Sequence, residues 1–321
     1  MKIRTALILG LGLIAGSALA VAQSGKQLSI ATGGTGGVYY PLGGGFANIL
    51  SKALPGVTAT AEVTGGSVDN LKLIGTGKAD LAFVQGDASW DAINGLDKFK
   101  SGKLDIKALV VMYPNHMHVV TVEGTGINKI EDLKGKRIST GSPGSATEVF
   151  AFRVLEAAGL DKDKDVKRER LGVAESVNAI KDQKIDAFLW VGGLPTAAVT
   201  DLAATPSTKL KLVDIAQLTE KMNAKYGPLY TAGKIPKATY PGLEGDNTNI
   251  AAWNLMAVNG NMDEKLAYDL TKTMMEHRPD LAQVHKEALN IKDENQTAKN
   301  AGMPWHPGAL KYYKEKGMKV E

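Results

Sequence analysis

The sequence contains no cysteine, which excludes disulfide bonds, thiol catalysis and cysteine-based metal sites. Positive charge is not concentrated anywhere: the formal net charge is +4, and the basic residues are scattered without interleaved aromatic side chains. This pattern argues against nucleic acid as a partner. Arginine is scarce and occurs only at Arg4, Arg137, Arg153, Arg168, Arg170 and Arg278. Because it has no disulfide bonds, a chain of this length relies on its hydrophobic core alone for stability.

Motifs for catalysis and nucleotide binding are also missing. There is no G-x-S-x-G elbow and no S-x-x-K motif. The first glycine-rich stretch is not a P-loop, because no Lys-Ser or Lys-Thr follows it, and Tyr39 occupies the third glycine position of a G-x-G-x-x-G fingerprint. We therefore expect a protein that is not an enzyme and binds no cofactor, with a periplasmic enzyme as the alternative.

Metal ligands are sparse as well. His116 and His118 are spaced to lie on one face of a strand, as a metal pair would. No third ligand and no neighbouring carboxylate accompany them, so we expect no metal site. His306 stands between Trp305 and Pro307, where a structural role is expected.

The N-terminus has the pattern of a signal peptide. Lys2 and Arg4 precede the apolar stretch 6–15, and two A-x-A cleavage patterns end at residues 20 and 22. An uncleaved membrane anchor is the alternative, but the apolar stretch is short for a span. Removing residues 1–22 takes away Lys2 and Arg4, so the charge becomes 36 − 34, or +2. We expect a soluble protein in the periplasm after cleavage.

One short glycine-rich phrase occurs twice. Residues 31–37 and 139–145 align so that Thr32, Gly33 and Gly36 match Thr140, Gly141 and Gly144. In both places a strand pattern comes before and a helix pattern follows. A helix that begins in such a loop presents unpaired N–H groups and the positive end of its dipole, which favours an anion. A plain strand-to-helix turn is the alternative.

A second internal echo supports a duplicated architecture. Ser67-Val68 leads to Lys78–Phe83, and Ser176-Val177 leads to Lys184–Phe188, in the same order as the first echo. The alternative is that all β–α–β units look alike. Alternating strands and helices predict parallel sheets with helices on both faces, and ligands then bind beyond the carboxyl ends of the strands.

Strand patterns at 106–113 and 117–122 predict a crossing between two halves, and the pattern at 250–258 predicts the return. Residues 203–250 show no long helix. Ser67 is expected to cap one helix. Before another helix, Pro143 suits the first helical position, and Ser145-Ala146-Thr147-Glu148 fits a capping box.

Candidate ligand-binding residues follow from these loops. Hydroxyls, backbone donors and two aromatic side chains carry the prediction; Arg153 can contribute only if the fold brings it in. Gln85 and Trp190 could equally serve the core, and one of the hydroxyls is expected to cap its helix. The predicted residues are Thr35, Gly36, Gly37, Val38, Tyr39, Thr64, Gly66, Ser67, Gln85, Ser142, Gly144, Ser145, Thr147, Trp190, Gly192 and Gly193.

At this point the sequence resembles a known family, the TAXI solute-binding proteins, which are extracytoplasmic receptors of one class of TRAP transporter. The resemblance runs through nearly the whole chain after residue 22. It rests on Gly34-Thr35-Gly36-Gly37-Val38-Tyr39-Tyr40-Pro41, Thr64-Gly65-Gly66-Ser67, Asp132-Leu133-Lys134-Gly135-Lys136-Arg137 followed by Gly141-Ser142-Pro143-Gly144-Ser145, Asp186-Ala187-Phe188 with Gly192-Gly193, and His306-Pro307-Gly308-Ala309 with Tyr312-Tyr313.

The resemblance implies an α/β, two-lobed periplasmic binding protein of type II, with a mixed sheet flanked by helices in each lobe and a hinge between them. Residues 23–113 with 255–321 would form one lobe and residues 114–254 the other. The implied ligand is a small organic anion, a four- or five-carbon dicarboxylate such as glutamate, glutamine or 2-oxoglutarate. The implied partners are TRAP membrane subunits, and we expect a monomer.

Two departures from the family pattern lie near the expected pocket. Ala146 stands where the family often has glycine, and Leu189-Trp190 stands where it has an aromatic pair. These differences leave the ligand open. An ABC-linked or sensor-linked binding protein with the same fold is the alternative function.

Overall fold

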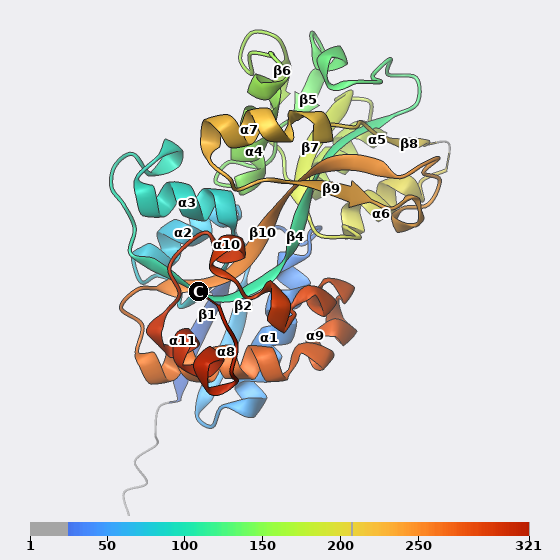
Figure 1. The fold of residues 1–321 in the computed structure, drawn as a ribbon. Helices are drawn as coiled ribbons and strands as arrows, with labels where there is room; N and C mark the ends of the chain where they lie inside the picture. The colour runs from blue at the N-terminus through green and yellow to red at the C-terminus, as the bar shows by residue number, and fades with distance from the viewer. Residues whose placement is uncertain (1–24, 207, 321) are drawn as a thin grey trace, which may run out of the picture.

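The computed structural model describes residues 25–206 and 208–320. The predicted signal peptide, residues 1–22, lies outside the described residues. The chain folds into an α/β structure whose two parts are joined by long strands (Figure 1). Within the described part of the chain, none of the helices combines the length and the apolar character needed to cross a bilayer.

The first part contains an N-terminal βαβαβ unit. It comprises β1 (Lys26–Ala31), α1 (Tyr39–Ala53), β2 (Val57–Glu62), α2 (Ser67–Gly75) and β3 (Leu81–Gln85). β1 lies in the middle and pairs in parallel with both β2 and β3. The first glycine-rich loop therefore leaves the carboxyl end of the central strand.

The second part repeats this arrangement. The second βαβαβ unit comprises β5 (Arg137–Ser139), α4 (Ala146–Ala157), β6 (Lys167–Glu169), α5 (Val173–Lys181) and β7 (Ala187–Gly192). β5 lies in the middle and pairs in parallel with β6 and β7. The second glycine-rich loop again follows the central strand.

Equivalent hydrogen bonds confirm that Thr32 and Thr140 occupy matching positions. The backbone N–H of Thr32 donates to the carbonyl of Glu62, and that of Thr140 donates to the carbonyl of Glu169, both at 3.0 Å. Thr32 thus ties β1 to β2, and Thr140 ties β5 to β6, which are the equivalent pairs of strands in the two units.

The aspartates of the second echo also match. Asp80 accepts the N–H of Ser29, and Asp186 accepts the N–H of Arg137, both at 2.8 Å. The helices before them, α2 and α5, are nine residues each, so their alignment places Ser67 opposite Val173. The two serines of the second echo, Ser67 and Ser176, therefore do not occupy equivalent positions.

Two long antiparallel strands connect the units. β4 (Ile106–Val122) and β10 (Asn247–Asn259) pair with each other and join both units in one sheet of order β2-β1-β3-β10-β4-β7-β5-β6. The two strands predicted on either side of Pro114 form one continuous strand. Pro114 lies opposite Trp253, beside a register shift in β10, where the missing proline N–H is tolerated.

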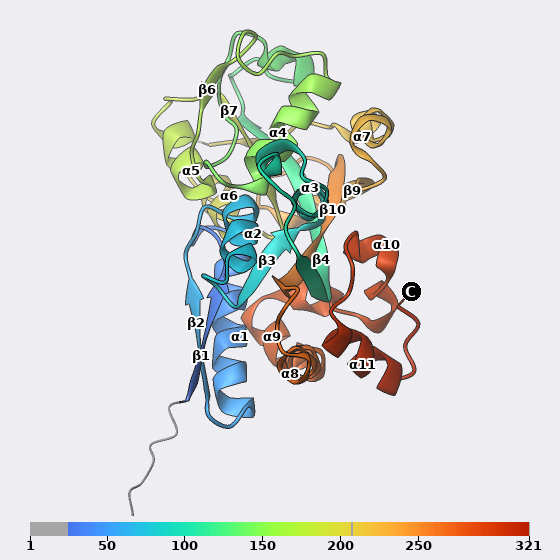
Figure 2. The ribbon, with the colours of Figure 1, turned by 90° about the vertical axis from the view of Figure 1, so that its left-hand side faces the viewer.

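The remaining helices flank this sheet (Figure 2), and two short strands, β8 and β9, extend it. The region 203–250, expected to lack a long helix, contains the eight-residue helix α7 and two short strands that pair with β4 and β10. These elements are α3 (Gly86–Asn94), α6 (Ala197–Ala203), β8 (Leu210–Leu212), α7 (Thr219–Tyr226), β9 (Thr231–Ile235), α8 (Glu264–Glu276), α9 (Arg278–Val284), α10 (Ala298–Ala301) and α11 (Pro307–Glu315).

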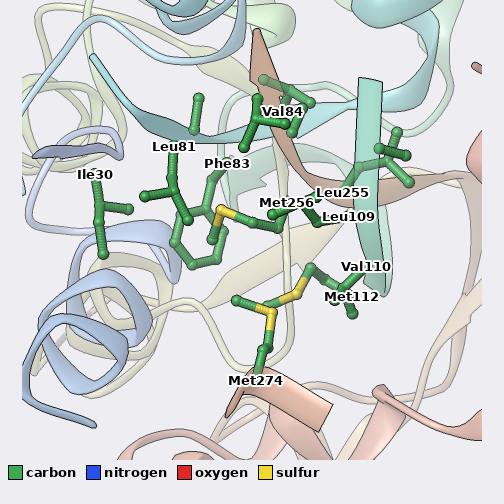
Figure 3. Close-up of a cluster of buried hydrophobic side chains, with 14 of the residues drawn as sticks. Ile30, Leu81, Phe83, Val84, Leu109, Val110, Met112, Leu255, Met256 and Met274 are labelled. Carbon is green, nitrogen blue, oxygen red and sulfur yellow. The ribbon is translucent and has the colours of Figure 1, made fainter. Parts of the chain in front are cut away.

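The hydrophobic core falls into three clusters. The first draws on residues 28–113 and 255–320, together with Ala146 and Val149 of α4. Figure 3 shows part of it, where Met274 of α8 approaches Met112 of β4. The other two clusters draw on residues 117–252. The lobe boundaries after residues 113 and 254 remain a prediction.

Candidate functional site

A cavity of about 410 Å³ lies where the two βαβαβ units face each other. All six parallel strands of these units direct their carboxyl ends at it, because its lining follows β1, β2, β3, β5, β6 and β7. This is the edge of a parallel sheet at which ligands are expected. The lining segments are 33–39, 63–67, 170–175 and 190–193, with Gln85, Tyr113, Asn115, Ser142, Ser145, Ala146 and Thr147.

The structure brings together every predicted site residue except Gly144. The residues that line the cavity are Thr35, Gly36, Gly37, Val38, Tyr39, Thr64, Gly66, Ser67, Gln85, Ser142, Ser145, Thr147, Trp190, Gly192 and Gly193. Gly144 lies outside the lining, and its carbonyl accepts the N–H of Asp69 at 3.0 Å. Its φ is +77°, and an added Cβ would stand 2.3 Å from the Asp69 carboxylate, so only glycine fits there.

Helix starts surround the cavity. α1, α2 and α5 begin after Val38, Gly66 and Gly172, and none of these three residues caps its helix with a side chain. The first N–H groups of such helices have no intrahelical partner. Several unpaired backbone donors and positive dipole ends therefore converge on one space, which favours a negatively charged ligand.

Two predicted helix starts need correction. α4 begins at Ala146 rather than at Pro143, because Ser145 takes the cap position and its Oγ accepts the N–H of Glu148 at 3.1 Å. The position before α2 belongs to Gly66, whose φ is +118°, a conformation that serine rarely adopts. Ser67 is the first helical residue, and its Oγ accepts the N–H of Gln85 at 3.1 Å.

Most of the predicted hydroxyls already have protein partners. The Thr64 hydroxyl lies 3.1 Å from the carbonyl of Thr32 and 2.6 Å from Asn70 Oδ1. Ser142 donates to the carbonyl of Gly65 at 3.1 Å, and Tyr39 donates to Asn254 Oδ1. Thr35 and Thr147 have no side-chain hydrogen bond to any residue that the structure describes. Their hydroxyls are therefore the ones available to a ligand.

Gln85 and Trp190 each line the cavity and also form hydrogen bonds with other side chains of the protein. Gln85 lines the cavity, but its Nε2 donates to Asp87 at 2.8 Å and its Oε1 accepts from Asn115 at 2.9 Å. Trp190 also lines the cavity, its indole N–H donates to Thr196 at 2.9 Å, and a Cβ at Gly37 would stand 3.2 Å from its ring. Trp190 thus forms an aromatic wall next to a glycine.

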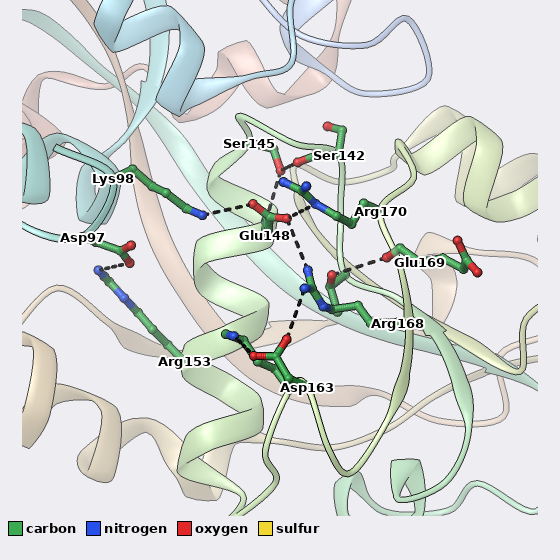
Figure 4. Close-up of polar contacts among 12 residues, drawn as sticks. Asp97, Lys98, Ser142, Ser145, Glu148, Arg153, Asp163, Arg168, Glu169 and Arg170 are labelled. Carbon is green, nitrogen blue, oxygen red and sulfur yellow. Dashed lines mark hydrogen bonds and ion pairs between the residues drawn. The ribbon is translucent and has the colours of Figure 1, made fainter.

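Arg170 and Glu175 line the cavity although sequence reasoning missed them. Arg170 follows β6 at the same sheet edge as the glycine-rich loops, and that position was the available signal. Its Nε donates to the buried carboxylate of Glu148 at 2.6 Å. Lys98 and Arg168 also approach this carboxylate, at 3.4 and 3.6 Å (Figure 4). Arg168 also pairs with Asp163 at 3.3 Å, so three cations and two carboxylates gather near the start of α4.

Arg153 does not reach the cavity. It is buried behind α4, where it pairs with Asp91 and donates to the Tyr230 hydroxyl at 2.8 Å. Its carboxylate partner comes from α3, so the arginine joins elements from the two parts of the chain.

Hydrogen bonds cross the cavity from one unit to the other. Besides the bond from Ser142 to Gly65 and the bond from Asp69 to Gly144, the N–H of Ala198 donates to the carbonyl of Gly36 at 3.2 Å. A Cβ at Gly36 would stand 3.2 Å from the side chains of Val173, Ala174 and Ala198. The two units are therefore in direct contact across the cleft.

The two histidines of β4 are occupied by protein groups. His116 Nδ1 lies 3.0 Å from Asn249 Oδ1, and His118 Nε2 lies 2.8 Å from the Tyr240 hydroxyl. Among residues 25–206 and 208–320, no group of three or more His, Asp or Glu side chains is placed to hold a metal ion. His306 Nδ1 accepts the N–H of Gly308 and so caps α11.

We expect His118 to make the protein sensitive to acid. Burial lowers the pKa of His118 to about 3, against about 6.5 in an unfolded chain. Between these values only the unfolded chain binds the proton, so this contribution to stability is complete above about pH 6.5 and falls by about 1.4 kcal/mol per pH unit below it. Urea unfolding of a His118→Gln variant should show a shallower pH slope. A slope equal to that of the original protein would contradict the prediction.

Comparison with known proteins agrees with this architecture. A model of the NMT1-like family matches residues 30–317. A solved structure of a protein from Bordetella bronchiseptica RB50 has a TM-score of 0.52 and 17% identity, and the match covers 90% of this chain and 88% of that one.

Two further solved structures are similar at lower scores. The periplasmic aliphatic sulphonate binding protein SsuA from Escherichia coli has a TM-score of 0.48 and 16% identity, covering 90% of this chain and 83% of that one. A putative L-cystine ABC transporter protein from Listeria monocytogenes has a TM-score of 0.49 and 16% identity, covering 83% and 95%. The predicted fold class, α/β with a mixed sheet flanked by helices, is confirmed.

Proposed function

This chain belongs to the NMT1-like family, and from that membership and the geometry of the cleft we propose that it is a periplasmic solute-binding protein for a small organic anion. The observation that carries the proposal is the single cavity onto which all six parallel strands and three uncapped helix starts converge. Donors of this kind stabilise negative charge without chemistry, so the proposed role is binding rather than catalysis.

Closure of the two units around the ligand is part of the proposal. We take residues 23–113 with 255–321 as one lobe and residues 114–254 as the other, with β4 and β10 as the connections between them. A ligand that contacts both lobes favours their contact, since it binds the closed form better than the open one. The cross-cleft bonds of Gly36, Gly65 and Gly144 are those that opening would break.

The proposed ligand class is a four- or five-carbon carboxylate such as glutamate, glutamine or 2-oxoglutarate. Support comes from the helix starts, from the free hydroxyls of Thr35 and Thr147, and from Arg170 on the second unit. One carboxylate would meet the loop 35–39. Another polar end would meet the residues 142–147.

Two membrane partners are candidates. An ABC permease is the type of system named in the titles of similar solved structures, including the Listeria protein, and it is the partner that the comparisons favour. A TRAP complex is the partner implied by the likeness of the glycine-rich motifs to TAXI proteins. Uptake that needs an ion gradient and no ATPase would identify the TRAP complex, and uptake that stops without ATP hydrolysis would identify the ABC permease.

A thermal-shift screen tests the anion proposal. Dicarboxylates, amino acids and keto acids are added to the protein, with sugars and divalent cations as controls. A true ligand at 100 times its Kd should add about 2.7 kcal/mol to the free energy of unfolding. A melting temperature that responds to a sugar or a cation, and to no carboxylate, would contradict the proposal, and so would formation of a product from the ligand that binds.

A further inference from the structure

The floor of the cleft contains two buried polar atoms without a protein partner. Tyr113 and Asn115 lie two residues apart on β4, so both side chains leave the same face of the strand, and both line the cavity. Their exposed fractions are 0% and 3%. The Tyr113 hydroxyl and Asn115 Oδ1 form no hydrogen bond with any residue that the structure describes. Native proteins rarely leave such atoms unpaired, so each requires an explanation.

The neighbours of Asn115 fix which of its atoms is unpaired. Asn115 Nδ2 donates to Gln85 Oε1 at 2.9 Å and to Asn254 Oδ1 at 2.8 Å. Gln85 cannot be reversed, because its Nε2 donates to the carboxylate of Asp87 at 2.8 Å. Asn254 cannot be reversed either, because its Nδ2 donates to the carbonyl of Tyr113 at 3.1 Å. A reversed Asn115 would face two acceptors with its oxygen, so the unpaired atom is an acceptor.

The Tyr113 hydroxyl can either donate or accept. Burial raises the pKa of Tyr113 well above its usual value, so the hydroxyl keeps its proton at neutral pH. Gly193 packs closely against the ring, since a Cβ there would stand 2.8 Å from it. The cavity floor therefore contains an unpaired acceptor, Asn115 Oδ1, and an unpaired hydroxyl, that of Tyr113.

We infer that Tyr113 and Asn115 form a subsite that recognises an N–H or O–H donor of the ligand, an inference that rests on the proposed receptor function. An amino, hydroxyl or carboxamide group can donate to Asn115 Oδ1 and pair with the Tyr113 hydroxyl. A carboxylate or keto oxygen in the same place would face Asn115 Oδ1 with lone pairs and leave that acceptor unsatisfied, which is costly. The ligand is thus an acid that carries such a donor.

Matched pairs of ligands test this inference. Isothermal titration of the chain without residues 1–22 compares L-glutamate with 2-oxoglutarate, and L-malate with succinate; each second compound lacks the donor. In the pair that binds, the donor-bearing acid should bind at least about tenfold more tightly. Equal or tighter binding of the compound without the donor overturns the inference but leaves the proposed function intact. Absence of binding by every carboxylate, in this set and in the wider screen, overturns both.

Substitutions at Tyr113 and Asn115 distinguish recognition of the ligand's donor group from a purely structural role. Tyr113→Phe should reduce the ratio between the affinity for the donor-bearing acid and the affinity for the acid without the donor. The melting temperature of the ligand-free variant should stay the same or rise, because the hydroxyl has no protein partner. Asn115→Leu should also reduce the ratio, measured on protein that remains folded. Thr205→Val, which removes an exposed hydroxyl outside the cavity, should leave the ratio unchanged. An unchanged ratio in Tyr113→Phe, or a lower melting temperature without ligand, overturns the inference.

Discussion

Replacing Gly36 with valine should lower the affinity for ligand by about 100-fold, since it overfills a tight contact. Its Cβ would already stand 3.2 Å from the side chains of Val173, Ala174 and Ala198 across the cleft, and valine adds two methyl groups. The contact exists only when the two units meet, so the change should penalise the closed form. A smaller closed population weakens the apparent affinity in proportion.

Gly34→Val in the same loop is the matched control. Gly34 is exposed, and a Cβ there would meet nothing within 4 Å, so this variant should bind nearly as well as the original protein. Titration calorimetry gives the affinities, and small-angle scattering reports whether ligand still compacts each variant. If Gly36→Val binds like Gly34→Val, closure at this contact is not required for binding.

Replacing Arg153 with methionine should destabilise the protein by about 3–5 kcal/mol, the usual effect of removing one partner from a buried ion pair. Arg153 pairs with Asp91 and lies 3.8 Å from Asp87, and all three side chains are buried. Without the guanidinium, two buried carboxylates lose their nearest cation. Lys181→Met is the control, because its pair with Asp201 is at the surface, where such pairs contribute about 0–1 kcal/mol.

The loss in the Arg153 variant should depend on pH. Burial raises the pKa of Asp91 to about 6, and Arg153 opposes this rise. Removing the arginine raises the pKa further, so Asp91 takes up a proton more readily in the folded state, and the proton relieves the unpaired charge. The loss of stability relative to the original protein should therefore be smaller at pH 5 than at pH 8. Denaturant unfolding at both pH values measures this, and an equal loss at each would contradict the role of Asp91.

The sequence predicted the glycine-rich loops of the site but missed Arg170, Tyr113 and Asn115. The glycine-rich loops were identifiable because glycine, serine and threonine beside a strand pattern mark strand-to-helix turns wherever they occur. Arg170 was missed because it follows an unremarkable strand, and only the parallel pairing of β5 with β6 brings that strand's end to the cavity. Tyr113 and Asn115 were missed because their meaning lies in unpaired atoms, which depend on neighbours from β3 and β10.

Local sequence patterns also predicted the starts of two helices incorrectly. Ser67 fits the preference for serine before a helix, but the chain needs a φ of +118° at that turn, and Gly66 supplies it. Pro143 suits a first helical position, yet α4 begins three residues later because the Ser145 side chain reaches the N–H of Glu148. The start of α4 thus follows the local cap between Ser145 and Glu148, and the start of α2 follows the backbone conformation that Gly66 supplies.

The sequence by itself determined the alternation of strands and helices, the two glycine-rich loops and their internal repeat, because these depend on residue spacing and backbone freedom within short segments. The tertiary structure alone decided which groups face the ligand, because that depends on segments far apart in the chain. It paired Gln85 with Asn115, turned Arg153 away from the cleft, brought Arg170 into it, and left Tyr113 and Asn115 with polar atoms that only a ligand or water can satisfy.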